Sequence, residues 1–149
     1  MQAGRAPHEA TMLLREIRDL SSAFEAHLGQ ALTVNPTDLT AMEHLIQDGP
    51  LTPTELARRL RVSTAAATTV IDRLTAVGHV MRTPNPADRR GVLVVPAPAS
   101  VARAMGALMP MIMDIDGVLG HFSEAEQSVI TDYLERVVAA YRAHIPTSD

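Results

Sequence analysis

Apolar residues recur at three- and four-residue steps near the start of the chain, which predicts a long amphipathic helix from residue 9 to about residue 32. Its expected inner face consists of Leu13, Ile17, Leu20, Phe24 and Leu28. A second helix should begin with Asn35 as its cap and Pro36 in its first turn. Gly49-Pro50 stops this helix, so two helices are expected before residue 50.

The next two helices are separated by a very short connection. Thr52 and Glu55 have the spacing of a capping box around Pro53, so a short helix should begin here. Ser63 is placed to cap the following helix, which we expect over residues 64 to about 77. A short helix, a three-residue turn and a longer helix together make a helix-turn-helix.

Two β-rich runs follow, over residues 79–83 and 91–95. The connection between them contains two prolines, an asparagine and two arginines, which predicts a hairpin with a protruding basic loop, or wing. Ser100 is then expected to cap another long helix, and Pro110 should kink or restart it. A last helix follows a second capping-box signal.

These elements predict a mainly α fold with a small β-hairpin wing, in a single domain of residues 1–149. Residues 36–96 form the expected winged helix-turn-helix core, and residues 9–34 and 98–145 form flanking helices. The flanking helices carry more apolar surface than such a core covers, and one copy alone would expose a large apolar patch. We therefore expect a homodimer, the alternative being a monomer whose flanking helices fold over the core.

Composition narrows the class of protein. There is no cysteine, which excludes disulfides and thiol chemistry. No apolar run approaches the roughly 20 residues of a membrane helix, and no secretion signal is evident, so a cytoplasmic protein without a membrane partner is expected. The chain shows no glycine-rich phosphate loop, nucleophile–base pair or metal-ligand spacing among its six histidines. We expect neither an enzyme nor a metal or cofactor site.

The net charge of −4 hides an asymmetry along the chain. Residues 51–92 hold seven arginines and three acidic residues, a local charge of +4, whereas the remainder holds six arginines and fourteen acidic residues. Every basic residue is arginine, whose rigid fork of donors suits phosphates and guanine edges. The basic segment coincides with the predicted winged helix, which indicates DNA as the partner.

The predicted helix over residues 64–77 has an outward face of small and hydroxyl-bearing side chains. Such a face can approach a major groove closely, and the methyl groups of alanine and threonine can meet the thymine methyl. The plain alternative, a solvated face, more often carries long charged residues. Arg89 and Arg90 are placed to enter a minor groove. Asp88 is expected to hold Arg73 or Arg90 by a bidentate pair rather than to contact DNA.

Several segments together resemble the MarR (multiple-antibiotic-resistance regulator) family over about residues 9–142. They are residues 37–45, 51–57, 62–63, 68–74, 78–80 and 85–90. The most specific are Asp72-Arg73-Leu74 before Gly78, and the wing sequence Asp88-Arg89-Arg90. This sequence departs from the family at Ala65-Ala66-Ala67, which leaves few polar base readers, and at Pro96-Ala97-Pro98-Ala99, where a Leu-Thr pair is usual.

The resemblance implies a homodimer that binds an imperfect palindrome in double-stranded DNA, with the second helix of the motif in the major groove and a wing arginine in the minor groove. Carried over by position, the DNA-binding residues are Ser63, Thr64, Thr68, Thr69, Arg73, Arg89 and Arg90, with Asp88 stabilising the wing. The predicted function is a sequence-specific, ligand-responsive transcription repressor. The alternative is a winged-helix protein-docking module without specific DNA binding, which would lack steep salt dependence.

The resemblance also implies a crevice between the dimer helices and the DNA-binding core, where a small lipophilic or phenolic effector binds. The residues expected to line it are Phe24, Met42, Met105, Leu108 and Met109. The plain alternative is that these side chains are ordinary core, since methionine fills irregular gaps well.

Overall fold

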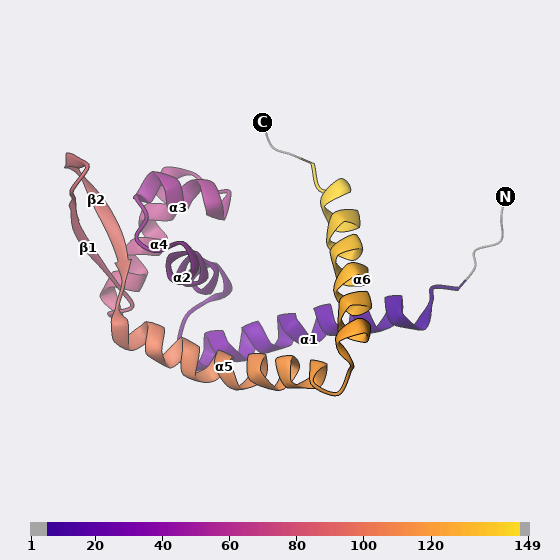
Figure 1. The fold of residues 1–149 in the computed structure, drawn as a ribbon. Helices are drawn as coiled ribbons and strands as arrows, with labels where there is room; N and C mark the ends of the chain where they lie inside the picture. Colours follow the sequence, from indigo (N-terminus) through magenta and orange to yellow (C-terminus); the bar gives the residue numbers. More distant parts are fainter. Residues whose placement is uncertain (1–5, 147–149) are drawn as a thin grey trace. The chain divides into compact units, whose positions relative to one another are not determined.

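A computed structural model describes residues 6–146, which form six helices and a β-hairpin (Figure 1). In chain order the elements are α1 (Glu9–Leu32), α2 (Pro36–Asp48), α3 (Pro53–Leu60), α4 (Thr64–Ala76), β1 (Val80–Asn85), β2 (Asp88–Pro96), α5 (Pro98–Leu119) and α6 (Glu124–Ala143). The predicted mainly α fold with a hairpin wing is confirmed. The chain divides into two compact units, the first ending at Ala107 and the second beginning at Leu108.

Local capping explains where the helices of the first unit begin. The Asn35 side chain accepts a hydrogen bond from the Asp38 N–H at 2.8 Å, and Pro36 occupies the first turn of α2. At α3 the capping box is complete, because the Glu55 carboxylate accepts from the Thr52 N–H at 2.8 Å while the Thr52 hydroxyl accepts from the Glu55 N–H at 3.2 Å. The backbone N–H and the hydroxyl of Thr52 both donate to the Glu55 carboxylate, and these two hydrogen bonds lower the pKa of Glu55.

The core of the winged helix lies between α2, α3, α4 and the hairpin. Its buried side chains are Ala41, Met42, Leu45, Leu51, Leu56, Val70, Ile71, Leu74, Val80 and Val94. Leu51 also pairs with Val94 through two backbone hydrogen bonds of 3.2 and 2.7 Å, so it adds a one-residue bridge to the hairpin. The core therefore holds α4 and the hairpin on the same small body (Figure 1).

The hairpin is longer and more tightly turned than the sequence predicts. Asn85 pairs with Asp88, so that only Pro86 and Ala87 connect the strands, with an irregularity between Pro84 and Asn85. The predicted hairpin is present, but most of the connection predicted over residues 84–90 belongs to the strands. Both strands of a two-stranded ribbon are edge strands, where proline is tolerated.

A second cluster of buried side chains joins α1, α2 and the first turns of α5. It consists of Leu28, Leu32, Leu39 and Ala104, with Phe24, Val34 and Ile46 packed against it. Ser100 does not cap α5 as predicted, because the helix already begins at Pro98 and Ser100 is buried inside its first turn. Pro110 lies within α5 and does not restart it.

The second unit contains the end of α5 and all of α6. Ser123 and Glu126 form the predicted capping box of α6, with hydrogen bonds of 2.8 and 3.3 Å. The Gln127 side-chain amide donates to the carbonyls of Leu119 and Phe122 and so closes the turn between the helices. No described residue of α6 is buried, although many are apolar. None of the helices in the described part of the chain has the length and apolar character needed to cross a bilayer.

Candidate nucleic-acid interface

Helix α4 has a buried face in the core and an opposite face of small side chains exposed to solvent. Ser63 caps the helix by accepting a hydrogen bond from the Ala66 N–H at 3.1 Å. The Thr68 hydroxyl donates to the Thr64 carbonyl at 2.9 Å, and the Thr69 hydroxyl donates to the carbonyl four residues earlier at 3.2 Å. The predicted residues Ser63, Thr64, Thr68 and Thr69 all lie on the exposed side of the helix.

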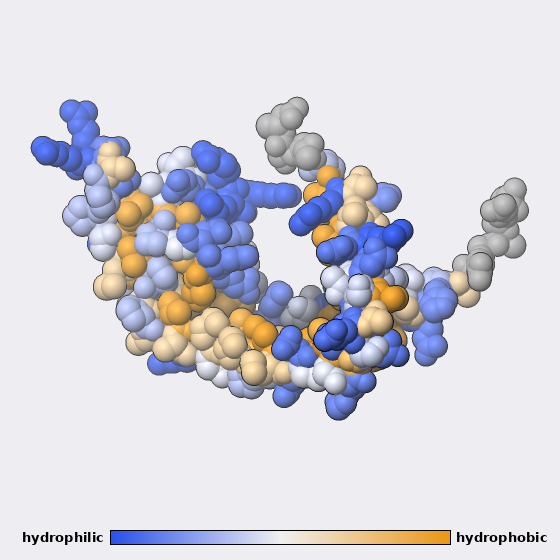
Figure 2. Space-filling model, in the orientation of Figure 1, coloured by the Kyte–Doolittle hydropathy of each residue, from blue (hydrophilic) through white to orange (hydrophobic). Residues whose placement is uncertain are grey.

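The hairpin carries the predicted wing arginines beside its turn. Arg89 and Arg90 are exposed at the start of β2, and neither forms an ion pair with another described residue. Figure 2 shows the end of the hairpin as a hydrophilic projection from the winged-helix body. Guanidinium groups that are charged, unpaired and projecting can bind phosphates or enter a minor groove.

The turn at the hairpin end is held by two short side chains. The Asn85 side chain accepts from the Ala87 N–H at 3.0 Å, and the Asp88 side chain accepts from the Arg90 N–H at 3.0 Å. Asp88 thus orders the backbone beside the wing arginines, whereas the predicted bidentate pair between Asp88 and an arginine side chain is not found in the described residues.

Arg73 forms its bidentate pair with a different carboxylate. Its Nη2 lies 2.6 Å from Oδ1 of Asp38 and its Nε lies 3.1 Å from Oδ2 of the same residue. Asp38 is buried in the first turn of α2, and the hydrogen bonds to it raise the pKa of Arg73. The pair therefore ties α4 to α2, and the guanidinium predicted to face DNA is held by the protein itself.

Arg82 was not singled out from the sequence, yet it connects the wing to α4. Its guanidinium pairs with Asp72 and also donates to the Thr75 hydroxyl at 3.4 Å. Because Arg82 lies on β1, this ion pair fixes the hairpin against the exposed side of α4. Alternation along the strand does not single out Arg82, because it follows two consecutive apolar residues, Val80 and Met81.

Known proteins are similar to this chain in sequence and in fold. The sequence profile of the MarR family matches residues 34–92. The HTH-type transcriptional regulator YcgE of Bacillus subtilis is 31% identical over 125 residues, covering 84% of this chain and 81% of that protein. The chain belongs to the MarR family.

Two further MarR-family proteins extend the comparison. The multiple antibiotic resistance protein MarR of Salmonella typhimurium is 39% identical over 74 residues, which are 46% of this chain and 51% of that protein. The crystal structure of a MarR-like regulator from Thermotoga maritima superposes with a TM-score of 0.67 at 25% identity, covering 91% of this chain and 99% of that one. As a MarR-family member, the chain is a DNA-binding transcription regulator and not an enzyme.

The predicted effector crevice is distributed over several parts of this MarR-family chain. Met42 is buried in the winged-helix core, whereas Phe24 packs against the second cluster. Met105 and Leu108 are half-buried along α5, and Met109 is 37% exposed. Leu108 and Met109 belong to the second unit. In the first unit the structure does not bring Phe24 and Met42 into one cluster, and the crevice stays a prediction.

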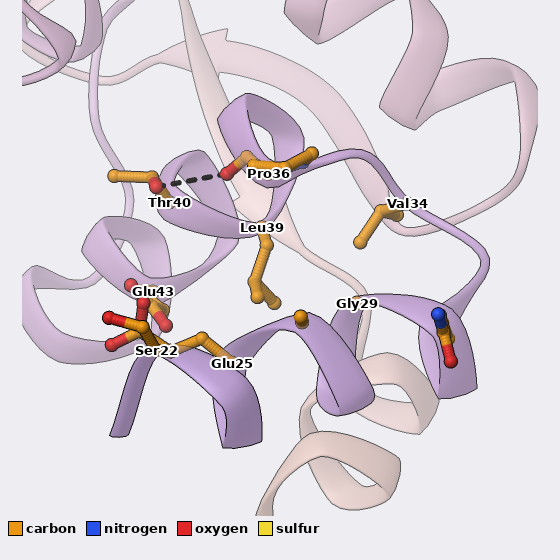
Figure 3. A pocket seen from close by; sticks show the side chains of 10 residues that line it. Ser22, Glu25, Gly29, Val34, Pro36, Leu39, Thr40 and Glu43 are labelled. Atoms are coloured by element: carbon orange, nitrogen blue, oxygen red, sulfur yellow. Dashed lines mark hydrogen bonds between the residues drawn. The ribbon is translucent and has the colours of Figure 1, made fainter. Parts of the chain in front are cut away.

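A cavity of about 330 Å³ lies between α1, α2 and the segment that joins them (Figure 3). Leu39, Gly29 and Val34 form part of its apolar wall, while Ser22, Glu25 and Glu43 gather at one end. Burial, together with the nearby Glu25 carboxylate, raises the pKa of Glu43. None of the five residues predicted to line the effector crevice lines this cavity. No group of three or more potential ligands in the described residues could hold a metal ion.

His79 is a buried histidine that no motif of the sequence singles out. Its Nε2 lies 2.8 Å from the carbonyl oxygen of Leu32 at the end of α1, and its Nδ1 lies 2.8 Å from the Ser100 hydroxyl in α5. A carbonyl can only accept, so the neutral ring carries its proton on Nε2 and accepts from Ser100 through Nδ1. One side chain thus connects three elements of the first unit.

Replacing His79 with alanine should lower the free energy of unfolding of the first unit by about 3 kcal/mol, since it leaves two buried polar groups unpaired and creates a cavity. Urea unfolding followed by circular dichroism measures this loss. His79→Gln retains one donor and should lose about half as much. An alanine variant as stable as the wild type would show that these hydrogen bonds contribute nothing.

Proposed function

We propose that this chain represses transcription as a homodimer that binds a pseudo-palindromic operator and releases it in response to a small molecule. The observation that supports this best is the exposed small-residue face of α4 beside the unpaired Arg89 and Arg90 of the wing, both mounted on one core. In this proposal α4 enters the major groove and the wing arginines reach the adjacent minor groove.

Exposed apolar side chains support the homodimer. In α1, Met12, Leu13, Ile17 and Leu20 are each more than half exposed. In α6 the exposed apolar side chains are Val129, Tyr133, Leu134, Val138 and Tyr141. A second copy of the chain can cover these apolar faces, because a symmetric dimer buries the same patch on both subunits. Such a dimer also places two reading helices about one DNA turn apart. Static light scattering should give twice the 16.0 kDa mass of one chain.

The proposed effector is a small lipophilic or phenolic molecule, bound where the flanking helices meet the winged helix. The acidic end of the cavity between α1 and α2, with Glu25 and Glu43, disfavours a phenolate anion there. A phenol would therefore bind this cavity in its neutral form, or bind at the crevice predicted from Phe24, Met42, Met105, Leu108 and Met109. Release of DNA on addition of the effector is the expected response.

DNA binding can be tested by fluorescence anisotropy with a labelled duplex from the gene's own upstream region. We expect the logarithm of the affinity to fall linearly with the logarithm of salt concentration, with a slope of about −0.9 for each phosphate neutralised. A competing unlabelled duplex of scrambled sequence should displace the probe poorly. Binding that is independent of salt, or equal for both duplexes, would overturn the proposal of a specific operator.

A further inference from the structure

The exposed side of the first two turns of α4 lacks any long polar side chain. The residues on it are Thr64, Ala65, Ala66, Thr68 and Thr69, preceded by the cap Ser63. The buried face opposite them consists of Ala67, Val70, Ile71 and Leu74. A helix that begins this way can lie deep in a groove, but it has no amide or guanidinium group with which to form bidentate hydrogen bonds to bases.

The threonine hydroxyls in the middle of this face are already used as donors. Thr68 donates to the carbonyl of Thr64 at 2.9 Å, and Thr69 donates to the carbonyl of Ala65 at 3.2 Å. The Ser63 oxygen accepts the Ala66 N–H at 3.1 Å. With the threonine protons held by the helix backbone, each of these threonines offers DNA a methyl group and the free lone pairs of its oxygen.

The major-groove edges of the four bases differ in what such a face can satisfy. Guanine presents two acceptors, N7 and O6, which are best satisfied by a bidentate donor. This part of α4 offers only single hydroxyl donors at its first turn, from Ser63 and Thr64. Thymine presents a C5 methyl group, an apolar surface that the methyls of Ala65 and Thr69 can cover. Methyl contact is therefore the best match between the exposed atoms of α4 and a base edge.

We propose that α4 recognises its operator half-site mainly through thymine C5 methyl groups, contacted by Ala65, Thr68 and Thr69. The inference rests on the proposed function, because it assigns the chemistry by which the same helix reads the same DNA. Each contacted methyl contributes about fourfold to affinity, as expected for the burial of one methylene-sized group. Arg89 and Arg90 add affinity from the minor groove and do not sense this methyl.

The test begins with selection of binding sites by the full-length protein from a random duplex library. Each thymine of the selected site is then replaced singly by deoxyuridine, which removes the C5 methyl and leaves hydrogen bonding, minor groove and phosphates unchanged. We expect an affinity loss of about fourfold at two or more thymines in each half-site and none at flanking thymines. If replacement of thymine by uracil changes the affinity by less than twofold at every position, the inference is overturned. The proposed function would still stand in that case, provided that binding remains salt-dependent and specific for the selected site.

Two matched variants assign the contact to the protein side. Thr69→Ser keeps the hydroxyl and removes the methyl, whereas Thr69→Val removes the hydroxyl and keeps a methyl. At a contacted position, the ratio of the affinities for the thymine-containing and uracil-containing sites should fall towards one in Thr69→Ser. In Thr69→Val the same ratio should stay close to its wild-type value. The opposite pattern would show that the hydroxyl reads the base and would overturn the methyl assignment. Failure to select any site, with no salt-dependent binding, would instead count against the proposed function.

Discussion

Replacing Arg89 and Arg90 together with alanine is expected to weaken operator binding by about 100-fold or more at 0.15 M salt. Both guanidiniums are exposed beside the two-residue turn of the hairpin, and neither is paired within the described part of the chain. Their charge is therefore available to DNA without first breaking an internal ion pair. Each lost phosphate or groove contact should also reduce the salt slope by about one unit.

The measurement is anisotropy of a labelled operator duplex at several salt concentrations. Arg103→Ala is the control for loss of positive charge elsewhere: it removes one guanidinium, half the charge lost in the wing variant, from an exposed position in α5 outside the reading helix and the wing. The wing variant should retain the circular dichroism spectrum of the wild type, because no packing is lost. If the wing variant and the control bind equally well with equal slopes, the wing does not contact DNA.

The helices could be predicted well because their ends are set by local chemistry. The long helix over residues 9–32 and the short one after Thr52 begin and end where the sequence places them, and the helix predicted to reach about residue 77 ends at Ala76. Asn35, Thr52 and Ser63 each accept a hydrogen bond from the N–H three residues later, so neighbouring residues alone are enough to predict their capping roles.

Contacts between distant segments could not be read in the same way. The partner of Arg73 is Asp38, 35 residues earlier, and any nearby carboxylate such as Asp88 fits the same sequence argument. His79 contacts Leu32 and Ser100, which lie 47 and 21 residues away. Their meeting depends on how α1, α4 and α5 pack. The same limit explains Ser100, whose capping signal was outweighed by an earlier helix start and a buried histidine partner.

Replacing Arg73 with alanine is expected to destabilise the first unit strongly, because it leaves the buried carboxylate of Asp38 without its partner. Asp38 is 4% exposed, and both of its oxygens accept hydrogen bonds from the guanidinium. Stranding a buried charge is among the most costly single changes, so the urea midpoint should fall by about 1 M or more. Asp38→Ala should cost less, since the released guanidinium reaches water, and adding Asp38→Ala to Arg73→Ala should restore part of the lost stability.

The same variants decide whether Arg73 acts on DNA directly or by positioning α4. If the ion pair positions the reading helix against α2, Asp38→Ala should weaken operator binding to a similar extent as Arg73→Ala. Binding is measured by anisotropy without urea, at a temperature well below that at which either variant unfolds. Arg73→Lys, which keeps the charge but not the bidentate fork, should fall between the wild type and the alanine variant. If Asp38→Ala instead binds the operator as tightly as the wild type while Arg73→Ala loses most of its affinity, Arg73 contacts DNA directly. Its guanidinium would then have to leave Asp38 in order to reach the DNA.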